Sequence, residues 1–233
     1  MGAFYYDRLN GSEQTIYRRA RRALTQLEPA ILAPRAQRDE VSAALRALLM
    51  DDPALFWFQG RWRFEGAEDV RRIAFAYSMS QAQVADAKTR ISEVVKPLLL
   101  TLDASSKRLA LYGAYRWLLA NVEYAEGPFA GQTLFDALIA RRAVCKGLSK
   151  AFSYFAEALG CECILREGTL DQKTRHIWNA VRLEDQWLNV DVSLGYSRFD
   201  FLFAPGQQSD PCRCFLVSDE ALKQTHIFDD LPI

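Results

Sequence analysis

Cys145 stands in a context that is typical of a reactive thiol. The segment that follows it ends at Gly160 and has one apolar face, formed by Leu148, Ala151, Phe152, Phe155 and Leu159. This pattern predicts a helix that begins at Cys145. Unpaired N–H groups and the positive end of the helix dipole stabilise a thiolate at such a position. The same N–H groups can receive the oxyanion of a tetrahedral intermediate.

Acyl transfer also needs a group that takes the thiol proton and returns a proton to the leaving group. The chain has 2 histidines. His176 opens a strand-like segment, whereas His226 lies in a polar tail, where we expect it to be solvated. His176 is therefore the predicted general base and acid.

Hairpin geometry can place a carboxylate beside His176. We expect Glu184 and Asp185 to form a two-residue turn. In this register Asp191 faces Trp178, on the same side as His176 and one diagonal step from it, about 7–8 Å away at Cα. A carboxylate there accepts the imidazole N–H and fixes its tautomer. The prediction depends on the register, because a slip of one residue would put the two side chains on opposite faces.

Three residues next to these are candidates for substrate binding. Lys146 brings a positive charge close to the thiol, unless it points into solvent, and Gly147 leaves room for a substrate backbone. Trp178 forms a wall of the cleft or, equally well, packs against the helix. Asn179 lies on the opposite strand face from His176, so we expect a structural role for it.

The elements that position these residues change in type along the chain. Helical periodicity, broken near Pro29 and Pro34, is found in residues 4–50, 81–100, 105–121 and 133–141. Aromatic residues in 55–64 predict a hairpin that turns near Gly60, and residues 73–77 add a strand. After Gly160 we expect strands at 161–167, 176–183, 186–192 and 213–217, and a helical turn at 219–223. Helices followed by an antiparallel sheet are typical of the α+β class.

Three motifs in this order resemble those of the transglutaminase-like branch of the papain superfamily. That family has a Cys-x-Gly motif at a helix start, a His-Ala-Trp-Asn strand, and an Asp-Val-Thr motif after a short hairpin. The chain has Cys145-Lys146-Gly147, His176-Ile177-Trp178-Asn179 and Asp191-Val192-Ser193. Residues 115–124 resemble the helix and tyrosine that precede the family's cysteine. The likeness covers roughly residues 109–217, and the N-terminal part is similar to a helical extension of some bacterial members.

The resemblance implies a papain-like fold, with a mainly helical region at 1–103 that carries the aromatic hairpin and a transglutaminase-like core at 104–233. It implies Cys145 as nucleophile, His176 as general base and then acid, and Asp191 as the orienting carboxylate. Gln132 is a second oxyanion donor by analogy with papain-like enzymes, or else part of a surface helix start. The departures from the family pattern remove no reacting group and bear on the substrate pocket: Leu148 for an aromatic residue, Ile177 for Ala and Ser193 for Thr.

The other four cysteines form two closely spaced pairs, Cys161 with Cys163 and Cys212 with Cys214. Zinc sites prefer two to four residues between paired cysteines, and each pair here has one. We therefore expect core packing for these thiols, with a zinc site as the alternative.

Composition limits the classes of partner. The chain has 29 basic and 29 acidic residues, so neither nucleic acid nor an anionic membrane is expected as a partner. No apolar run approaches the ~20 residues that span a bilayer, and residues 1–14 do not resemble a signal peptide. An odd count of 5 cysteines indicates a reducing compartment. We expect a cytoplasmic chain, or an exported one if a signal preceded this sequence.

Taken together, the residues predict an enzyme that acts on amide bonds of a peptide or protein through a thioester on Cys145. Water as acceptor makes it a peptidase or amidase, and a lysine amine makes it a transglutaminase. Hydrolysis is favoured because it needs only one bound substrate. The chemistry requires no metal or organic cofactor. The alternatives are a catalytically silent scaffold protein with this fold, and a partner-binding module built from the N-terminal helices and the hairpin.

Overall fold

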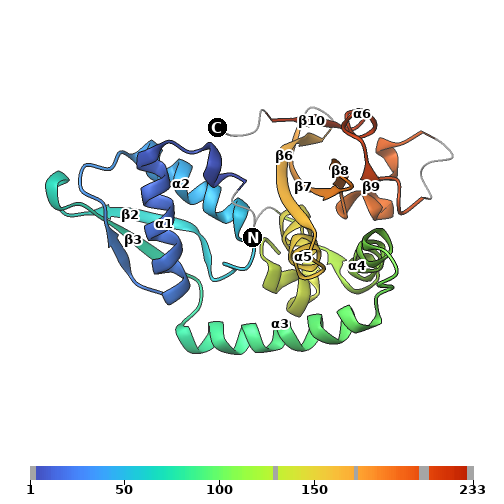
Figure 1. Ribbon diagram of the computed structural model, residues 1–233, viewed down its shortest axis with the longest axis horizontal. Helices are drawn as coiled ribbons and strands as arrows, with labels where there is room; N and C mark the ends of the chain where they lie inside the picture. The colour runs from blue at the N-terminus through green and yellow to red at the C-terminus, as the bar shows by residue number, and fades with distance from the viewer. Residues whose placement is uncertain (1–3, 128–130, 171–172, 205–209, 230–233) are drawn as a thin grey trace. The chain divides into compact units, whose positions relative to one another are not determined.

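The computed structural model describes residues 4–127, 131–170, 173–204 and 210–229 (Figure 1). The chain divides into two compact units, residues 2–88 and 89–232. The division falls within the long helix α3 (Gln81–Thr101). In the described part of the chain, no helix combines the length and the apolar character needed to cross a bilayer.

The N-terminal unit packs two helices with a three-stranded antiparallel sheet of order β1-β3-β2. Asn10 and Glu13 form a capping box at the start of α1, which fixes where that helix begins. Tyr17, Ala20 and Leu24 are buried on one face of α1. The elements of this unit are η1 (Tyr6–Arg8), α1 (Gly11–Gln26), β1 (Ala30–Leu32), α2 (Arg38–Asp51), β2 (Phe58–Glu65), η2 (Glu68–Val70) and β3 (Arg72–Tyr77).

The predicted turn at Gly60 is wrong. Gly60 lies inside β2 with a φ of 81°, at a register shift between Phe58 and Trp62. The positive φ therefore produces an irregularity within the strand and not a reversal of the chain. The chain reverses instead between Glu65 and Arg72, and the predicted strand at 73–77 pairs with β2 as β3.

The C-terminal unit packs helix α5 against an antiparallel sheet of order β10-β6-β7-β8-β9 (Figure 1). This arrangement confirms the predicted α+β class, with the helix that carries Cys145 lying on the sheet. The elements that follow α3 are α4 (Lys107–Asn121), β4 (Glu123–Tyr124), η3 (Asp136–Ala140), β5 (Arg142–Ala143), α5 (Cys145–Ala158), β6 (Glu162–Leu170), β7 (Thr174–Leu183), β8 (Gln186–Val190), η4 (Ser193–Gly195), η5 (Ser197–Leu202), β9 (Phe215–Val217), α6 (Asp219–Leu222) and β10 (His226–Phe228).

The β7–β8 hairpin has the predicted register. Glu184 and Asp185 form the turn, with φ values of 50° and 63°, and Leu183 pairs with Gln186. The ladder ends at Val190. Asp191 therefore lies just past the strand end, where its N–H donates to the carbonyl of Cys214 at 2.9 Å.

Strand β10 was not expected from the sequence. It adds to the edge of the sheet beside β6, with His226 opposite Leu170 and Phe228 opposite Gly168. A side chain at Gly168 would place its Cβ 2.1 Å from the carbonyl oxygen of Ile227. The glycine thus allows the close approach through which the chain end, including His226, joins the sheet.

Candidate active site

Helix α5 begins at Cys145, as predicted. Its apolar face is fully buried: Leu148, Ala151, Phe152 and Phe155. Two hydrogen bonds attach the first turns of the helix to β7. The hydroxyl of Ser149 donates to the carbonyl of Ile177 at 3.0 Å, and the amide of Asn179 donates to the carbonyl of Ser149 at 3.0 Å. Asn179 thus has the predicted structural position, and Cys145 is held beside the start of β7.

The thiol of Cys145 is hydrogen-bonded to the imidazole of His176 and to the backbone N–H of Ile177. Burial by itself opposes ionisation of the thiol. The hydrogen bond and positive charge of His176, with the N–H of Ile177, outweigh burial, so the pKa of Cys145 is lowered. A lowered pKa increases the fraction of the nucleophilic thiolate at neutral pH.

His176 links the thiol to Asp191. Its Nε2 lies 2.6 Å from Oδ2 of Asp191, which leaves Nδ1 for the thiol. Burial of the ring disfavours the imidazolium, but the charge and hydrogen bond of Asp191, together with the contact to Cys145, raise the pKa of His176 to about 10. The lowered thiol pKa and the raised imidazole pKa favour a thiolate–imidazolium pair.

Asp191 is 0% exposed and accepts four hydrogen bonds. Oδ2 accepts from Nε2 of His176 at 2.6 Å and from Nε2 of His226 at 3.0 Å. Oδ1 accepts from the N–H groups of Ser193 and Leu194 at 2.8 and 3.4 Å. Burial would raise the pKa of this carboxyl, but the two imidazoles hold it well below its ordinary value. Asp191 is therefore ionised and fixed in place.

The expectation that His226 is a solvated tail residue is wrong. His226 is 1% exposed and shares the carboxylate of Asp191 with His176. Sequence reasoning missed it because β10 joins the sheet through a long-range pairing with β6. A weak local signal was present: His226 and Phe228 alternate with the exposed Ile227, as in a half-buried strand.

A cleft of about 800 Å³ opens over Cys145 and His176. Gln132 and Lys146, two of the candidates for substrate or oxyanion binding, line it. Its charged lining residues are of both signs: Glu126, Lys146, Glu167, Arg175 and Arg198. The cleft therefore provides a place where a substrate can reach the thiol.

Gly147 does not have the predicted place in the cleft, and Trp178 is buried, which was the alternative to a place in the cleft wall. A Cβ at Gly147 would lie 2.3 Å from the carbonyl of Gly131, so the missing side chain makes room for the protein's own loop rather than for a substrate. Trp178 is 0% exposed. It stacks against His176, with ring centroids 6.3 Å apart and planes at 17°, and its Nε1 donates to Asn189 at 3.1 Å. It supports the imidazole from within the core.

Tyr124 is a site residue that no specific prediction named. The parallel pairing of β4 with β5 sets Tyr124 opposite Ala143, two positions before Cys145. Its hydroxyl accepts a hydrogen bond from the backbone N–H of Cys145, and burial raises its pKa, so it stays protonated. A neutral O–H group therefore lies at the N–H that a substrate oxyanion would use.

The other cysteines differ from Cys145. All five thiols are free and lie in the described part of the chain. Burial raises the pKa of Cys161 and Cys214, and that of Cys163 to about 12. Among the described residues, the potential ligand atoms that lie within 4.8 Å of one another belong to His176, Asp191 and His226 and not to the cysteine pairs. Separations of 2.6 and 3.0 Å between their nitrogens and the shared oxygen are those of hydrogen bonds.

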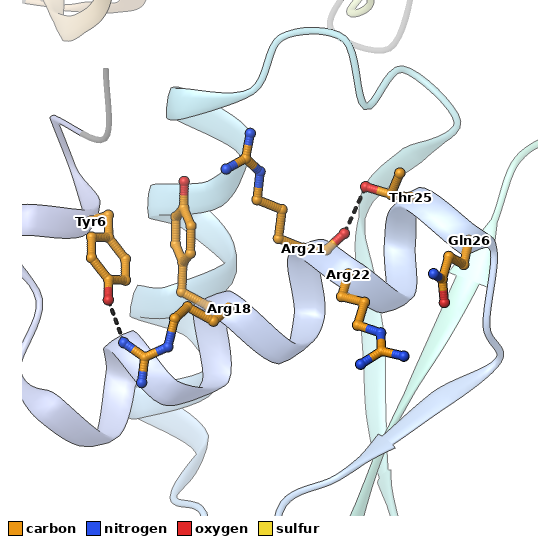
Figure 2. Close-up of a pocket in the computed structure, with 7 residues that line it drawn as sticks. Tyr6, Arg18, Arg21, Arg22, Thr25 and Gln26 are labelled. Carbon is orange, nitrogen blue, oxygen red and sulfur yellow. Dashed lines mark hydrogen bonds between the residues drawn. The ribbon is translucent and has the colours of Figure 1, made fainter. Parts of the chain in front are cut away.

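The N-terminal unit has a hollow of about 650 Å³ along α1 (Figure 2). Its arginines do not converge on a common point. Arg18 donates to the hydroxyl of Tyr6, Arg21 forms an ion pair with Asp52 at 3.7 Å, and Arg22 points away from Arg21 (Figure 2). The described residues that line this hollow include no thiol, imidazole or carboxylate.

Comparison with known proteins places this site in a family. Residues 100–192 match the sequence profile of the Transglutaminase-like superfamily. No curated protein matches the chain. Among solved structures, the chain is similar to a TGase, with 11% identity over 57% of this chain and 44% of the other, and a TM-score of 0.42.

Two further solved structures are similar. One, from Cytophaga hutchinsonii, is provisionally assigned as a cysteine protease: 12% identity, 57% of this chain, 61% of the other, TM-score 0.38. Another, from Parabacteroides distasonis, is provisionally assigned as a protease: 11% identity, 57% of this chain, 39% of the other, TM-score 0.34. The chain spans about half the length of the solved structures it matches. The region that holds the candidate site is a transglutaminase-like domain.

Proposed function

We propose that this protein is a cysteine-dependent enzyme that transfers the acyl group of an amide bond, in a peptide or protein, through a thioester on Cys145. One observation carries the proposal: thiol, imidazole and carboxylate form a continuous hydrogen-bonded chain that opens into a cleft. This arrangement supplies a nucleophile, a proton carrier and a group that orients the carrier.

In the first half of the reaction, the Cys145 thiolate attacks the carbonyl carbon of the amide. The resulting oxyanion is received by the backbone N–H of Cys145 and by the hydroxyl of Tyr124, which lies at that N–H. Gln132, which also lines the cleft, is the alternative second donor. The imidazolium of His176 gives its proton to the leaving amine, the C–N bond breaks, and a thioester remains.

In the second half, an acceptor attacks the thioester. His176, now neutral, takes a proton from the acceptor as the acceptor attacks. The C–S bond then breaks. The proton either stays on His176, which restores the thiolate–imidazolium pair, or passes to the sulfur of Cys145. Asp191 holds the ring in the tautomer that this exchange needs. Water as acceptor releases a carboxylic acid. We favour water, because hydrolysis requires no second binding site for an amine.

The proposal is tested by mass spectrometry of a peptide library incubated with the protein and a free amine. We expect new carboxylic acid products with the wild-type protein and none with Cys145→Ala. Amine adducts in place of acids would make the protein a transglutaminase. If a thiol-reactive probe labels Cys145 no faster at neutral pH than it labels the urea-unfolded chain, the protein is a silent scaffold and the proposal is wrong.

A further inference from the structure

His226 shares one oxygen of Asp191 with His176. The two Nε2 atoms lie 3.0 and 2.6 Å from Oδ2, and the two ring centroids are 5.5 Å apart. An ionised carboxylate only accepts hydrogen bonds, so each Nε2 carries the hydrogen. The proposed reaction uses His176 and Asp191 and leaves His226 without a role.

We infer that His226 is a positioning residue for the proposed active site: its Nε2–H fixes the Asp191 carboxylate and reduces the pull of that carboxylate on the His176 proton. The inference rests on the proposed function, because it takes His176 to be the residue that carries the proton in that reaction. In this way His226, and with it strand β10, directly influences the basicity of His176.

The orientation of His226 is fixed at both ring nitrogens. Nδ1 lies 2.8 Å from the hydroxyl of Thr225, and this hydroxyl lies 3.3 Å from the carbonyl of Leu222. The ring also packs edge-on against Trp178, with centroids 4.7 Å apart. The side chain is 0% exposed, so it cannot turn toward solvent without breaking these contacts.

Strand β10 is attached to the part of the sheet that bears the site. Beyond its ladder with β6, Asp229 at its end accepts two hydrogen bonds from Arg175 at 2.8 and 2.6 Å. Arg175 precedes His176 on β7 and lines the cleft. Residues 226–229 therefore contact β7 in two places: His226 packs against Trp178 in the core, and Asp229 binds Arg175 at the cleft.

The charge argument has a definite sign. A hydrogen bond donated to a carboxylate stabilises its anion and makes it a weaker acceptor for a second donor. Removing the donor at His226 concentrates the negative charge of Asp191 on His176. The pKa of His176 should then rise further above its ordinary value, and the ring should give up its proton less readily to a leaving amine.

Other titratable groups around the carboxylate do not produce this effect. Tyr115 on α4, Tyr124 on β4 and Cys214 before β9 all interact with Asp191. Burial raises the pKa of each, so all three stay neutral in the pH range where His176 and Cys145 change charge.

The test is an NMR titration of the imidazole of His176 in protein labelled with 15N-histidine. The chain has 2 histidines, so a His226 variant leaves a single, unambiguous imidazole signal. We expect His226→Phe, which keeps a ring but has no donor, to raise the pKa of His176 by about one unit, the shift that corresponds to one charge-assisted hydrogen bond. His226→Gln, which retains an N–H donor, should give a value near that of the wild type.

Phe228→Leu is the matched control, because it alters the packing of β10 on Trp178 without removing a donor. A pKa that rises in His226→Phe alone supports the inference. Equal values in all variants, or an equal shift in His226→Phe and Phe228→Leu, would overturn it. If His226→Phe does not fold, His226→Met takes its place.

Alkylation of Cys145 by iodoacetamide separates this inference from the proposed function. In the wild type we expect fast alkylation at neutral pH, with an alkaline limb set by His176. His226→Phe should move that limb to higher pH by about one unit. A wild-type thiol that reacts like a free cysteine would contradict the proposed function, while the NMR titration would still decide the role of His226.

Discussion

Each unit of the molecule has a carboxylate that accepts several hydrogen bonds, the half-buried Asp51 in the N-terminal unit and the buried Asp191 in the C-terminal unit, and the two behave in opposite ways. Asp51 in the N-terminal unit accepts from the N–H groups of Tyr5 and Tyr6, both at 3.0 Å, and from the hydroxyl of Tyr17 at 3.1 Å. Burial dominates there, and the pKa of Asp51 is raised. Asp191 is more deeply buried, yet its pKa is lowered.

The difference lies in the charge of the donors. Neutral amides and a phenol do not fully offset the cost of burying a negative charge, whereas an imidazolium does. The pKa of Tyr17 rises with that of Asp51, so this pair resists ionisation. At the other carboxylate, ionisation of Asp191 favours the charged form of His176, and this in turn favours the thiolate. The same physics therefore favours a neutral carboxyl at Asp51 and an ionised carboxylate at the candidate site.

Replacing each carboxylate by its amide gives the largest expected contrast. Asp191→Asn puts an amide where His176 donates, so the imidazole loses its orientation and its raised pKa. We expect the alkylation of Cys145, and any turnover, to fall roughly 10²–10⁴-fold. Asp51→Asn should leave both rates unchanged. Rates are compared at several pH values, and equal effects of the two substitutions would contradict the distinction between the carboxylates.

Two glycines offer the next contrast, in stability. A Cβ at Gly168 would lie 2.1 Å from the backbone of Ile227, whereas no atom lies within 4 Å of a Cβ at Gly11. We expect Gly168→Ala to reduce the free energy of unfolding by about 1–3 kcal/mol, because β10 must move. Gly11→Ala at the start of α1 should change it by less than about 0.5 kcal/mol. Urea denaturation measures both, and a neutral Gly168→Ala would show that β10 is not held closely.

The pH dependence of stability should have opposite signs at the two carboxylates. The pKa of Asp191 is depressed, so its contribution is present above the unfolded value of about 3.9 and is lost as the pH falls. His176 contributes below about 6.5, and this contribution is lost as the pH rises toward 10. Asp51, with a raised pKa, contributes below about 3.9 and loses its contribution as the pH rises.

We therefore expect the free energy of unfolding of the wild type to decrease on acidification by an amount of the order of 2 kcal/mol. Asp191→Asn should abolish this decrease. Asp51→Asn should remove a smaller effect of the opposite sign. Urea denaturation between pH 3 and 7 measures these slopes. A wild-type slope that Asp191→Asn leaves intact would show that other groups cause the acid dependence.

Two tyrosines, the buried Tyr17 and the half-buried Tyr124, give the smallest contrast. Tyr17→Phe removes the phenol that Asp51 accepts from and should cost about 1 kcal/mol in stability without slowing the thiol chemistry. Tyr124→Phe removes the hydroxyl beside the Cys145 N–H. It should lower turnover about tenfold or more, with little effect on the rate of alkylation, which forms no oxyanion. If Gln132→Ala lowers turnover and Tyr124→Phe does not, Gln132 is the second donor.

Local sequence signals were sufficient for the elements that carry the predicted site. The apolar face from Leu148 to Phe155 predicted where α5 begins, because a helix buries residues three and four positions apart. Glu184 and Asp185 predicted the turn, and a two-residue turn fixes the register of the strands on both sides. Cys145, His176 and Asp191 could be named because each lies at or close to the end of such an element.

Local signals failed where the outcome depended on packing. Gly60 has the positive φ of a turn, but its strand continues because β3 pairs with β2 both before Gly60, at Phe58, and after it, from Trp62 to Glu65. Gly147 faces the loop at Gly131 instead of the cleft, and the choice for Trp178 between a cleft wall and a buried position was decided by packing in the core. The sequence indicates which of these residues are small or apolar but not which neighbour they meet.

His226 marks the boundary between the two kinds of information. The sequence by itself determined a thiol at a helix start, an imidazole on a strand and a carboxylate after a tight hairpin, since each follows from interactions between residues close in the chain. Only the tertiary structure decided that the chain end returns to β6 and brings a second imidazole to Asp191. That pairing joins residues 170 and 226, and three residues of strand have too little periodicity to predict it.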